Sequence, residues 1–205
     1  MLERFRQFWT RLLTPIANLL LRLGVSPDAV TLVGTIGVSA GALYFFPRGE
    51  LLVGVLVITA FVFSDLIDGH MARSAGTSSR WGAFLDSSLD RIADAAIFGG
   101  LVLYFAHDQD DMLMATVALY CLVMGSLTSY VRARAESLGW QAKVGIAERA
   151  DRLVAVLVLA GFSEIFNLPV LLDIVLWALA AASTVTVVQR MIVVRRQALA
   201  DDVPA

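Results

Sequence analysis

Apolar residues dominate this chain in long blocks that short polar segments separate. A membrane-spanning helix needs about 20 mostly apolar residues, and six blocks approach that length: 29–46, 51–72, 82–106, 112–135, 150–168 and 170–194. Polar turns lie at 47–50, 107–111 and 163–169, and longer polar loops lie at 74–80 and 135–148. The pattern predicts an all-α membrane protein with six transmembrane helices.

The first 24 residues follow a different pattern, because arginines alternate with apolar residues at helical spacing. Such a segment is typical of an amphipathic helix that lies on the membrane surface. Gly24 ends it, and Ser26 or Asp28 is expected to cap the first span. We therefore expect three parts: a juxtamembrane amphipathic helix at 1–24, a six-helix transmembrane domain at 25–196 and a polar C-terminal tail at 197–205.

Composition and charge exclude several classes of protein. The chain is 58% hydrophobic and 17% charged, whereas a soluble domain has about 45–50% apolar and about 25% charged residues. A net charge of −2 argues against an extended nucleic-acid surface, and one cysteine, Cys121, excludes a disulfide scaffold. With six spans both termini lie on the same side of the membrane. Among the basic residues of the loops and termini, only Arg48 falls on the opposite side. The positive-inside rule predicts a multi-pass protein of the cell membrane with cytoplasmic termini.

The second and third predicted spans hold five carboxylates, where each charge costs about 2.5–3.5 kcal/mol on insertion scales: Asp65, Asp68, Asp86, Asp90 and Asp94. The first four have informative positions. Asp65 and Asp68 are three residues apart in the second span, and Asp86 and Asp90 are four apart in the third. Each pair shares one helix face. The connecting loop centres near Thr77, so antiparallel neighbours bring both pairs to similar depth near the cytoplasmic surface.

Clustered carboxylates in a low dielectric require compensation, and oxygen-only ligands favour Mg²⁺ or Mn²⁺. Arg73 and Ser79 lie near the same end, where they suit a phosphate. A two-metal site at the membrane surface suits a diphosphate with a lipid tail. The alternative is a set of Asp–Arg ion pairs that bind the two helices together, with Arg73, Arg80 or Arg91 as partners.

The same residues resemble a known signature. Asp65, Asp68, Gly69, Ala72, Arg73, Gly82, Asp86 and Asp90 match every fixed position of the CDP-alcohol phosphotransferase motif over 26 positions. The resemblance covers essentially the whole chain. It implies that an alcohol attacks the β-phosphate of a CDP-linked lipid and that CMP leaves.

The resemblance also implies roles for individual residues. Asp65, Asp68, Asp86 and Asp90 are expected to bind metal, with two ions per subunit in the family's pattern, and Asp90 is expected to act as the general base. The CDP-lipid contacts implied are Asp28, Ala29, Val30, Thr31, Gly69, Arg73 and Ser79. Asp94 lies outside the signature, and we expect it to support the site or to pair with Arg91.

Arginines at the cytoplasmic ends of the last three spans favour an acceptor that carries phosphate, because guanidinium groups bind phosphate bidentately. The candidates are Arg132, Arg134, Arg149, Arg152 and Arg190, whereas Arg195 and Arg196 are better explained by the positive-inside bias. These segments resemble actinobacterial phosphatidylinositol phosphate synthases. That resemblance implies 1D-myo-inositol 3-phosphate as acceptor and CDP-diacylglycerol as donor.

Other functions remain open at this point. A phosphatidylglycerophosphate synthase would use glycerol 3-phosphate, which is also anionic. A cation- or proton-coupled transporter would also hold acids in its spans, but it predicts acids at the midplane and internal repeats, and neither is found. The family resemblance further implies a homodimer.

Overall fold

A computed structural model describes Pro15, residues 19–74 and residues 79–201, with the side chains of all of these except 63–70 and 72–74. All regular structure in these ranges is helical: α2 (Pro27–Phe45), the short η1 (Phe46–Arg48), α3 (Leu51–Ser74), α4 (Arg80–Leu103), the π-helical turn η2 (Tyr104–Asp108), α5 (Met112–Ser137), α6 (Arg149–Ile165) and α7 (Val170–Asp201). Each apolar block therefore coincides with one long helix, and the all-α prediction is confirmed for the described residues. The predicted amphipathic helix at 1–24 falls mainly outside them.

Polar residues mark the helix ends as their chemistry predicts. Ser26 caps α2, because its Oγ accepts a hydrogen bond from the Ala29 amide at 3.2 Å. The Asp111 carboxylate accepts from the Met114 amide at 2.9 Å and caps α5. Glu148 and Asp151 form a reciprocal capping box at the start of α6. Of the two caps predicted for α2, the structure selects Ser26.

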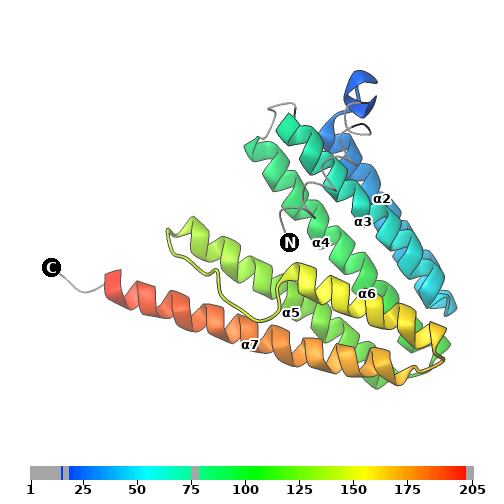
Figure 1. Cartoon of the computed structure of the whole chain (residues 1–205). Helices are drawn as coiled ribbons and strands as arrows, with labels where there is room; N and C mark the ends of the chain where they lie inside the picture. Colours follow the sequence, from blue (N-terminus) through cyan, green and yellow to red (C-terminus); the bar gives the residue numbers. More distant parts are fainter. Residues whose placement is uncertain (1–14, 16–18, 75–78, 202–205) are drawn as a thin grey trace, which may run out of the picture. The chain divides into compact units, whose positions relative to one another are not determined.

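The first compact unit contains α2, most of α3 and most of α4 (Figure 1). Glycines allow α2 and α3 to approach closely: a Cβ built on Gly41 would lie 3.0 Å from Cγ1 of Val57. Small residues at such contacts are typical of helices packed in membranes. This close packing holds α2 against α3.

The second unit contains η1, the end of α4, η2, α5, α6 and α7. Cys121 of α5 is buried and its thiol donates to the Leu176 carbonyl of α7 at 3.3 Å. At the preceding residue of α5, the Tyr120 hydroxyl lies 2.8 Å from Thr184 Oγ1. These contacts join α5 to α7, and the residues from 138 to 148, between α5 and α6, run beside α7 (Figure 1). We call this segment the α5–α6 loop.

The surface of the helices is apolar. In the described part of the chain, three helical segments are long and apolar enough to cross a membrane by length and composition, namely Pro27–Arg48, Met112–Ser137 and Val170–Asp201. Large apolar side chains such as Val33, Ile36 and Val123 are more than half exposed. An extended exposed apolar surface is expected where lipid replaces water. The helices thus have the character of a membrane protein.

Candidate active site

Two carboxylates of the signature lie on α4. Asp86 and Asp90 are four residues apart and therefore share one face, where Asp86 is exposed and the Asp90 side chain keeps 22% of its area accessible. Accessible carboxylate oxygens fit a hard divalent cation such as Mg²⁺ or Mn²⁺. The donor chemistry of this face therefore suits the expected metal.

The rest of the expected metal site lies beyond the described side chains. Asp65 and Asp68 are positions of α3, but their side chains are among those not described. Among the side chains that are described, no group of three or more acidic, histidine or cysteine residues could hold a metal ion. The four-carboxylate site stays a prediction.

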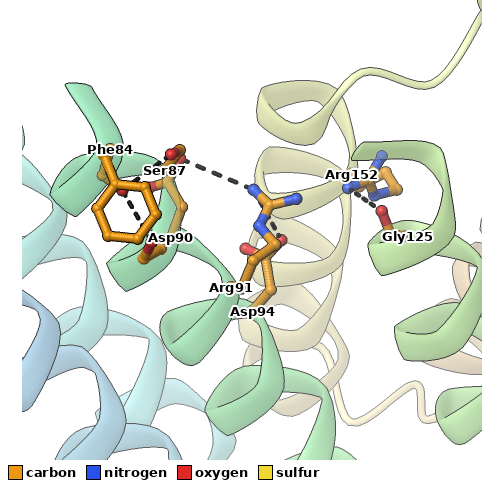
Figure 2. Close-up of polar contacts among 8 residues, drawn as sticks. Phe84, Ser87, Asp90, Arg91, Asp94, Gly125 and Arg152 are labelled. Carbon is orange, nitrogen blue, oxygen red and sulfur yellow. Dashed lines mark hydrogen bonds and ion pairs between the residues drawn. The ribbon is translucent and has the colours of Figure 1, made fainter. Parts of the chain in front are cut away.

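Arg91 lies beside the carboxylate face (Figure 2). Its Nη2 is 3.7 Å from Oδ2 of Asp90 and 3.6 Å from Oδ2 of Asp94. Asp94 is only 4% exposed, so a nearby cation offsets part of the cost of burying its charge. The predicted pairing of Asp94 with Arg91 is confirmed. All three residues belong to α4, so these ion pairs do not tie two helices together.

The N-terminal ends of α2 and α4 meet around Gly82. The Asp28 carboxylate accepts a hydrogen bond from the Trp81 indole at 3.1 Å, and Ser79 Oγ accepts from the Gly82 amide at 2.9 Å. A Cβ on Gly82 would lie 3.4 Å from Ser79 Oγ and 3.9 Å from Asp28 Oδ1. The structure therefore brings together two residues predicted to contact the CDP-lipid.

This place suits an anionic ligand. Helix N-termini carry partial positive charge and present amide donors that favour phosphate. Trp81 is a member of the site that sequence reasoning missed, although its position directly before the signature glycine Gly82 could have drawn attention to it. Its indole fixes the direction of the Asp28 carboxylate.

The other residues predicted to bind the CDP-lipid lie on α2 and α3. Ala29 and Val30 are half-buried in the first turn of α2. Thr31 is 9% exposed, and its hydroxyl donates to the Pro27 carbonyl at 3.1 Å, within the same helix. Gly69 and Arg73 lie among the residues whose side chains are not described.

Three of the arginines predicted to bind the acceptor phosphate remain accessible. Arg132 Nε lies 3.0 Å from the Glu136 carboxylate, and Arg134 donates to Ser137 Oγ at 3.3 Å, both along the exposed end of α5. Arg149 is half-buried at the first position of α6. The described partners of Arg132 and Arg134 lie on their own helix.

The other two arginines are buried and face the same turn of α5. Arg152 is 1% exposed and donates to the Gly125 carbonyl at 3.4 Å (Figure 2). Arg190 is 3% exposed and donates to the Thr128 carbonyl at 2.6 Å. Gly125 and Thr128 are three residues apart, so both guanidinium groups reach one side of α5. Arginine side chains that are nearly fully buried are rare without a specific function or partner.

Comparisons with known proteins agree with the signature. Residues 24–183 match the family model described as CDP-alcohol phosphatidyltransferase. A phosphatidylinositol phosphate synthase of Streptomyces avermitilis is 54% identical over 209 residues, which covers 98% of this chain and 86% of the relative.

Solved structures of phosphatidylinositol phosphate synthases are also similar to this chain. The crystal structure of Mycobacterium tuberculosis phosphatidylinositol phosphate synthase with CDP-DAG bound has a TM-score of 0.86 and 44% identity, and covers 90% of this chain and 94% of that one. The same enzyme in complex with manganese and citrate has a TM-score of 0.82 and 44% identity, over 89% and 88% of the two chains.

The family predicted from the Asp65–Asp90 signature is thus confirmed. The matched model spans the start of α2, the carboxylate face of α4 and the first part of α7, up to residue 183. These findings favour an enzyme over the transporter considered from the sequence. The chain belongs to the CDP-alcohol phosphatidyltransferase family and is a phosphotransferase.

Proposed function

We propose that this protein transfers the phosphatidyl group of CDP-diacylglycerol to 1D-myo-inositol 3-phosphate and releases CMP. The observation that carries the proposal is similarity over nearly the full chain to synthases of phosphatidylinositol phosphate, one of them with CDP-DAG bound. The coverage of both chains is high, so the similarity extends beyond the shared family motif to the acceptor segments.

The donor site is built on the signature and on the start of α2. Asp28, Ala29, Val30, Thr31, Gly69, Arg73 and Ser79 are its proposed CDP-lipid contacts. The meeting of Asp28 and Ser79 around Gly82 supports this assignment, because a glycine there leaves room for a ligand against two helix N-termini.

Asp65, Asp68, Asp86 and Asp90 are the proposed metal ligands, for two Mg²⁺ or Mn²⁺ ions. The accessible oxygen donors on α4 fit such ions, and the related Mycobacterium tuberculosis synthase has been solved with manganese. When bound, the ions would supply charge neutralisation for the diphosphate.

Asp90 is the proposed general base. Its carboxylate takes the proton of the acceptor hydroxyl, the hydroxyl oxygen bonds to the β-phosphorus, and the bond from that phosphorus to the CMP oxygen breaks. Asp90→Asn keeps the size of the side chain but removes its basicity, so we expect CMP release to fall by about 10²-fold or more. Ser87→Ala, on the same helix, is the matched control, because the Ser87 hydroxyl donates within the helix, to the Phe84 carbonyl. Normal turnover in Asp90→Asn would exclude this role.

The proposed acceptor contacts are Arg132, Arg134, Arg149, Arg152 and Arg190. The decisive experiment mixes purified protein, CDP-diacylglycerol and Mg²⁺ with one acceptor at a time: inositol phosphate, glycerol 3-phosphate, serine or free inositol. We expect CMP release with inositol phosphate. A preference for glycerol 3-phosphate would identify the protein as a phosphatidylglycerophosphate synthase. A preference for free inositol would refute the role of the arginines in binding phosphate.

We further propose the topology that the apolar blocks predict: an interfacial helix at 1–24, six spans within 25–196, a polar tail at 197–205, and both termini with the active site in the cytoplasm of the cell membrane. A helix at each of the six blocks supports it. In a Cys121→Ala background, an impermeant maleimide added outside intact cells should label Arg48→Cys and leave Lys143→Cys unlabelled. The homodimer is likewise a proposal, which light scattering in detergent tests.

A further inference from the structure

The α5–α6 loop is held along α7 by hydrogen bonds in a regular order. The Gln141 amide donates to Gln197 Oε1 at 2.9 Å, and Gln197 Nε2 donates back to the Gln141 carbonyl at 2.7 Å. Further along the loop, the Ile146 amide donates to Thr186 Oγ1 at 3.2 Å. Residue numbers increase along the loop while those of its hydrogen-bond partners on α7 decrease. The loop therefore runs antiparallel to the helix.

The loop is extended between the Gln141 and Ile146 contacts with α7. The eleven residues from Thr186 to Gln197 span about 16 Å of helix. The five residues from Gln141 to Ile146 can reach at most about 18 Å when fully extended. The backbone between the two anchors therefore runs in an extended form beside α7.

Thr186 is the anchor at the α6 end of the loop. Its side chain is 0% exposed, and its Oγ1 accepts from two consecutive amides, those of Ile146 and Ala147, both at 3.2 Å. The same hydroxyl donates to the Ala182 carbonyl at 2.8 Å, which directs its lone pairs toward the loop. One buried side chain thereby satisfies two backbone donors that have no helix or strand partner.

Gly145 shows how closely the loop approaches this anchor. A Cβ at that position would lie 2.3 Å from Thr186 Cγ2, and the backbone has φ +137°. Only glycine combines this conformation with this approach. The close contact between the loop and Thr186 therefore requires glycine at position 145.

The two buried arginines donate to carbonyls at the two ends of this anchored turn. Arg190 Nε donates to the Val144 carbonyl at 2.8 Å, and Arg152 Nη1 donates to the Ala147 carbonyl at 3.0 Å. Each guanidinium has five N–H donors in a fixed plane. Its bond to the loop carbonyl and its second bond, from Arg190 to Thr128 and from Arg152 to Gly125, together fix the orientation of that plane.

We propose that Thr186 is a positioning residue for the acceptor's phosphate: it holds the 144–147 segment, whose first and last carbonyls aim the guanidinium groups of Arg190 and Arg152. This inference rests on the proposed function, in which those two arginines bind the anionic acceptor. Thr186 does not touch the phosphate. It acts through the backbone of the loop.

The test compares Thr186→Val, which keeps the shape but loses the acceptor oxygen, with Thr186→Ser, which keeps the oxygen. The matched control is Thr184→Val, two residues away on α7, whose hydroxyl bonds Ala180 and Tyr120 but no loop amide. Full-length protein is assayed for CMP release, with KM determined separately for inositol phosphate and for CDP-diacylglycerol.

We expect Thr186→Val to raise KM for inositol phosphate about tenfold, the factor for about 1.4 kcal/mol, with KM for CDP-diacylglycerol unchanged. Thr186→Ser should restore the wild-type KM, and Thr184→Val should resemble the wild type. If Thr186→Val cannot be purified folded, Thr186→Ala removes the same oxygen without a second methyl group and carries the same expectation.

Equal rises in both KM values, or no change in either, would overturn the positioning role, as would a failure of serine to rescue. A wild-type enzyme that ignores inositol phosphate would instead refute the proposed function. The two failures are thus distinguished by different proteins in the same assay.

Discussion

Gly37 of α2 lies against Phe61 of α3, and replacing it with alanine tests the packing of the first unit. A Cβ at Gly37 would lie 2.3 Å from Cδ1, 2.4 Å from Cγ and 2.5 Å from Cε1 of Phe61. Favourable carbon–carbon contacts lie at about 3.5–4.0 Å. The new methyl group would therefore overlap the body of the ring rather than the tip of a flexible side chain.

Two opposing terms set the size of the effect. Alanine is better than glycine in a helix interior by about 0.8–1.0 kcal/mol. To remove the overlap, the Phe61 ring or the helix axis must shift by about 1 Å, and overpacking of this kind costs about 1–3 kcal/mol. Because the overlap involves three ring atoms, we expect the upper part of that range and a net loss of about 2 kcal/mol. For a chain of this size that corresponds to a fall in Tm of about 4–8 °C.

Thermal unfolding in detergent, followed by circular dichroism, measures this shift. Gly99→Ala is the matched control, since it substitutes a helical glycine with nothing within 4 Å of the new Cβ, so its Tm should rise slightly. Gly37→Ala/Phe61→Leu should recover part of the loss. If Gly37→Ala raised Tm as much as Gly99→Ala does, the close approach of α2 and α3 would be wrong.

Three further predictions concern the candidate active site. Chelation with EDTA should abolish CMP release and excess Mg²⁺ or Mn²⁺ should restore it, because oxygen ligands hold these ions reversibly; activity that survives full chelation would exclude the metal site. Trp81→Phe removes the indole donor to Asp28 and should raise KM for CDP-diacylglycerol about 2- to 10-fold, with unchanged Tm; an unaltered KM would show that this hydrogen bond does not orient Asp28 for binding. Arg91→Met takes the cation away from the buried Asp94 and should cost about 1–3 kcal/mol of stability, measured as a lower Tm, whereas Arg91→Met/Asp94→Leu should be more stable than Arg91→Met alone.

The helices and their ends could be predicted from the sequence, because both depend on local properties. An apolar run of sufficient length indicates a buried or lipid-facing helix, and the polar residues Asp111 and Glu148 cap neighbouring amides within three positions. The helix of the last span continues to Asp201, beyond the apolar block that ends at 194. Hydropathy marks the apolar part of a helix, whereas polar residues with good helix propensity extend it.

The carboxylate face of α4 could also be predicted, since residues four apart on a helix share a face whatever surrounds them. The same acids lower the apolar character of α4, which is not among the helical segments that qualify as spans by composition. The residues that carry the chemistry thus weaken the hydropathy signal of the helix that holds them.

The surroundings of the arginines depended on the tertiary structure. Their number and their clustering at helix ends could be read from the sequence, and these suggested a phosphate site. Arg190, however, donates to the carbonyl of Thr128, which is 62 residues away in the chain, and the loop it holds bonds to Thr186 at a separation of 40. No local pattern encodes such pairs, because they arise only when α5, the loop and α7 pack together.

The sequence by itself therefore determined the helices and the family, since apolar runs indicate the helices and the spacing of the signature residues from Asp65 to Asp90 indicates the family. The tertiary structure alone decided that Asp28 meets Ser79 around Gly82, and that Arg152 and Arg190 are buried with the loop rather than spread along the surface. The physical reason is that burial and backbone hydrogen bonding outside helices are properties of the packed chain. Burial and these hydrogen bonds depend on which segments come into contact. The separation of residues along the sequence does not reveal those contacts.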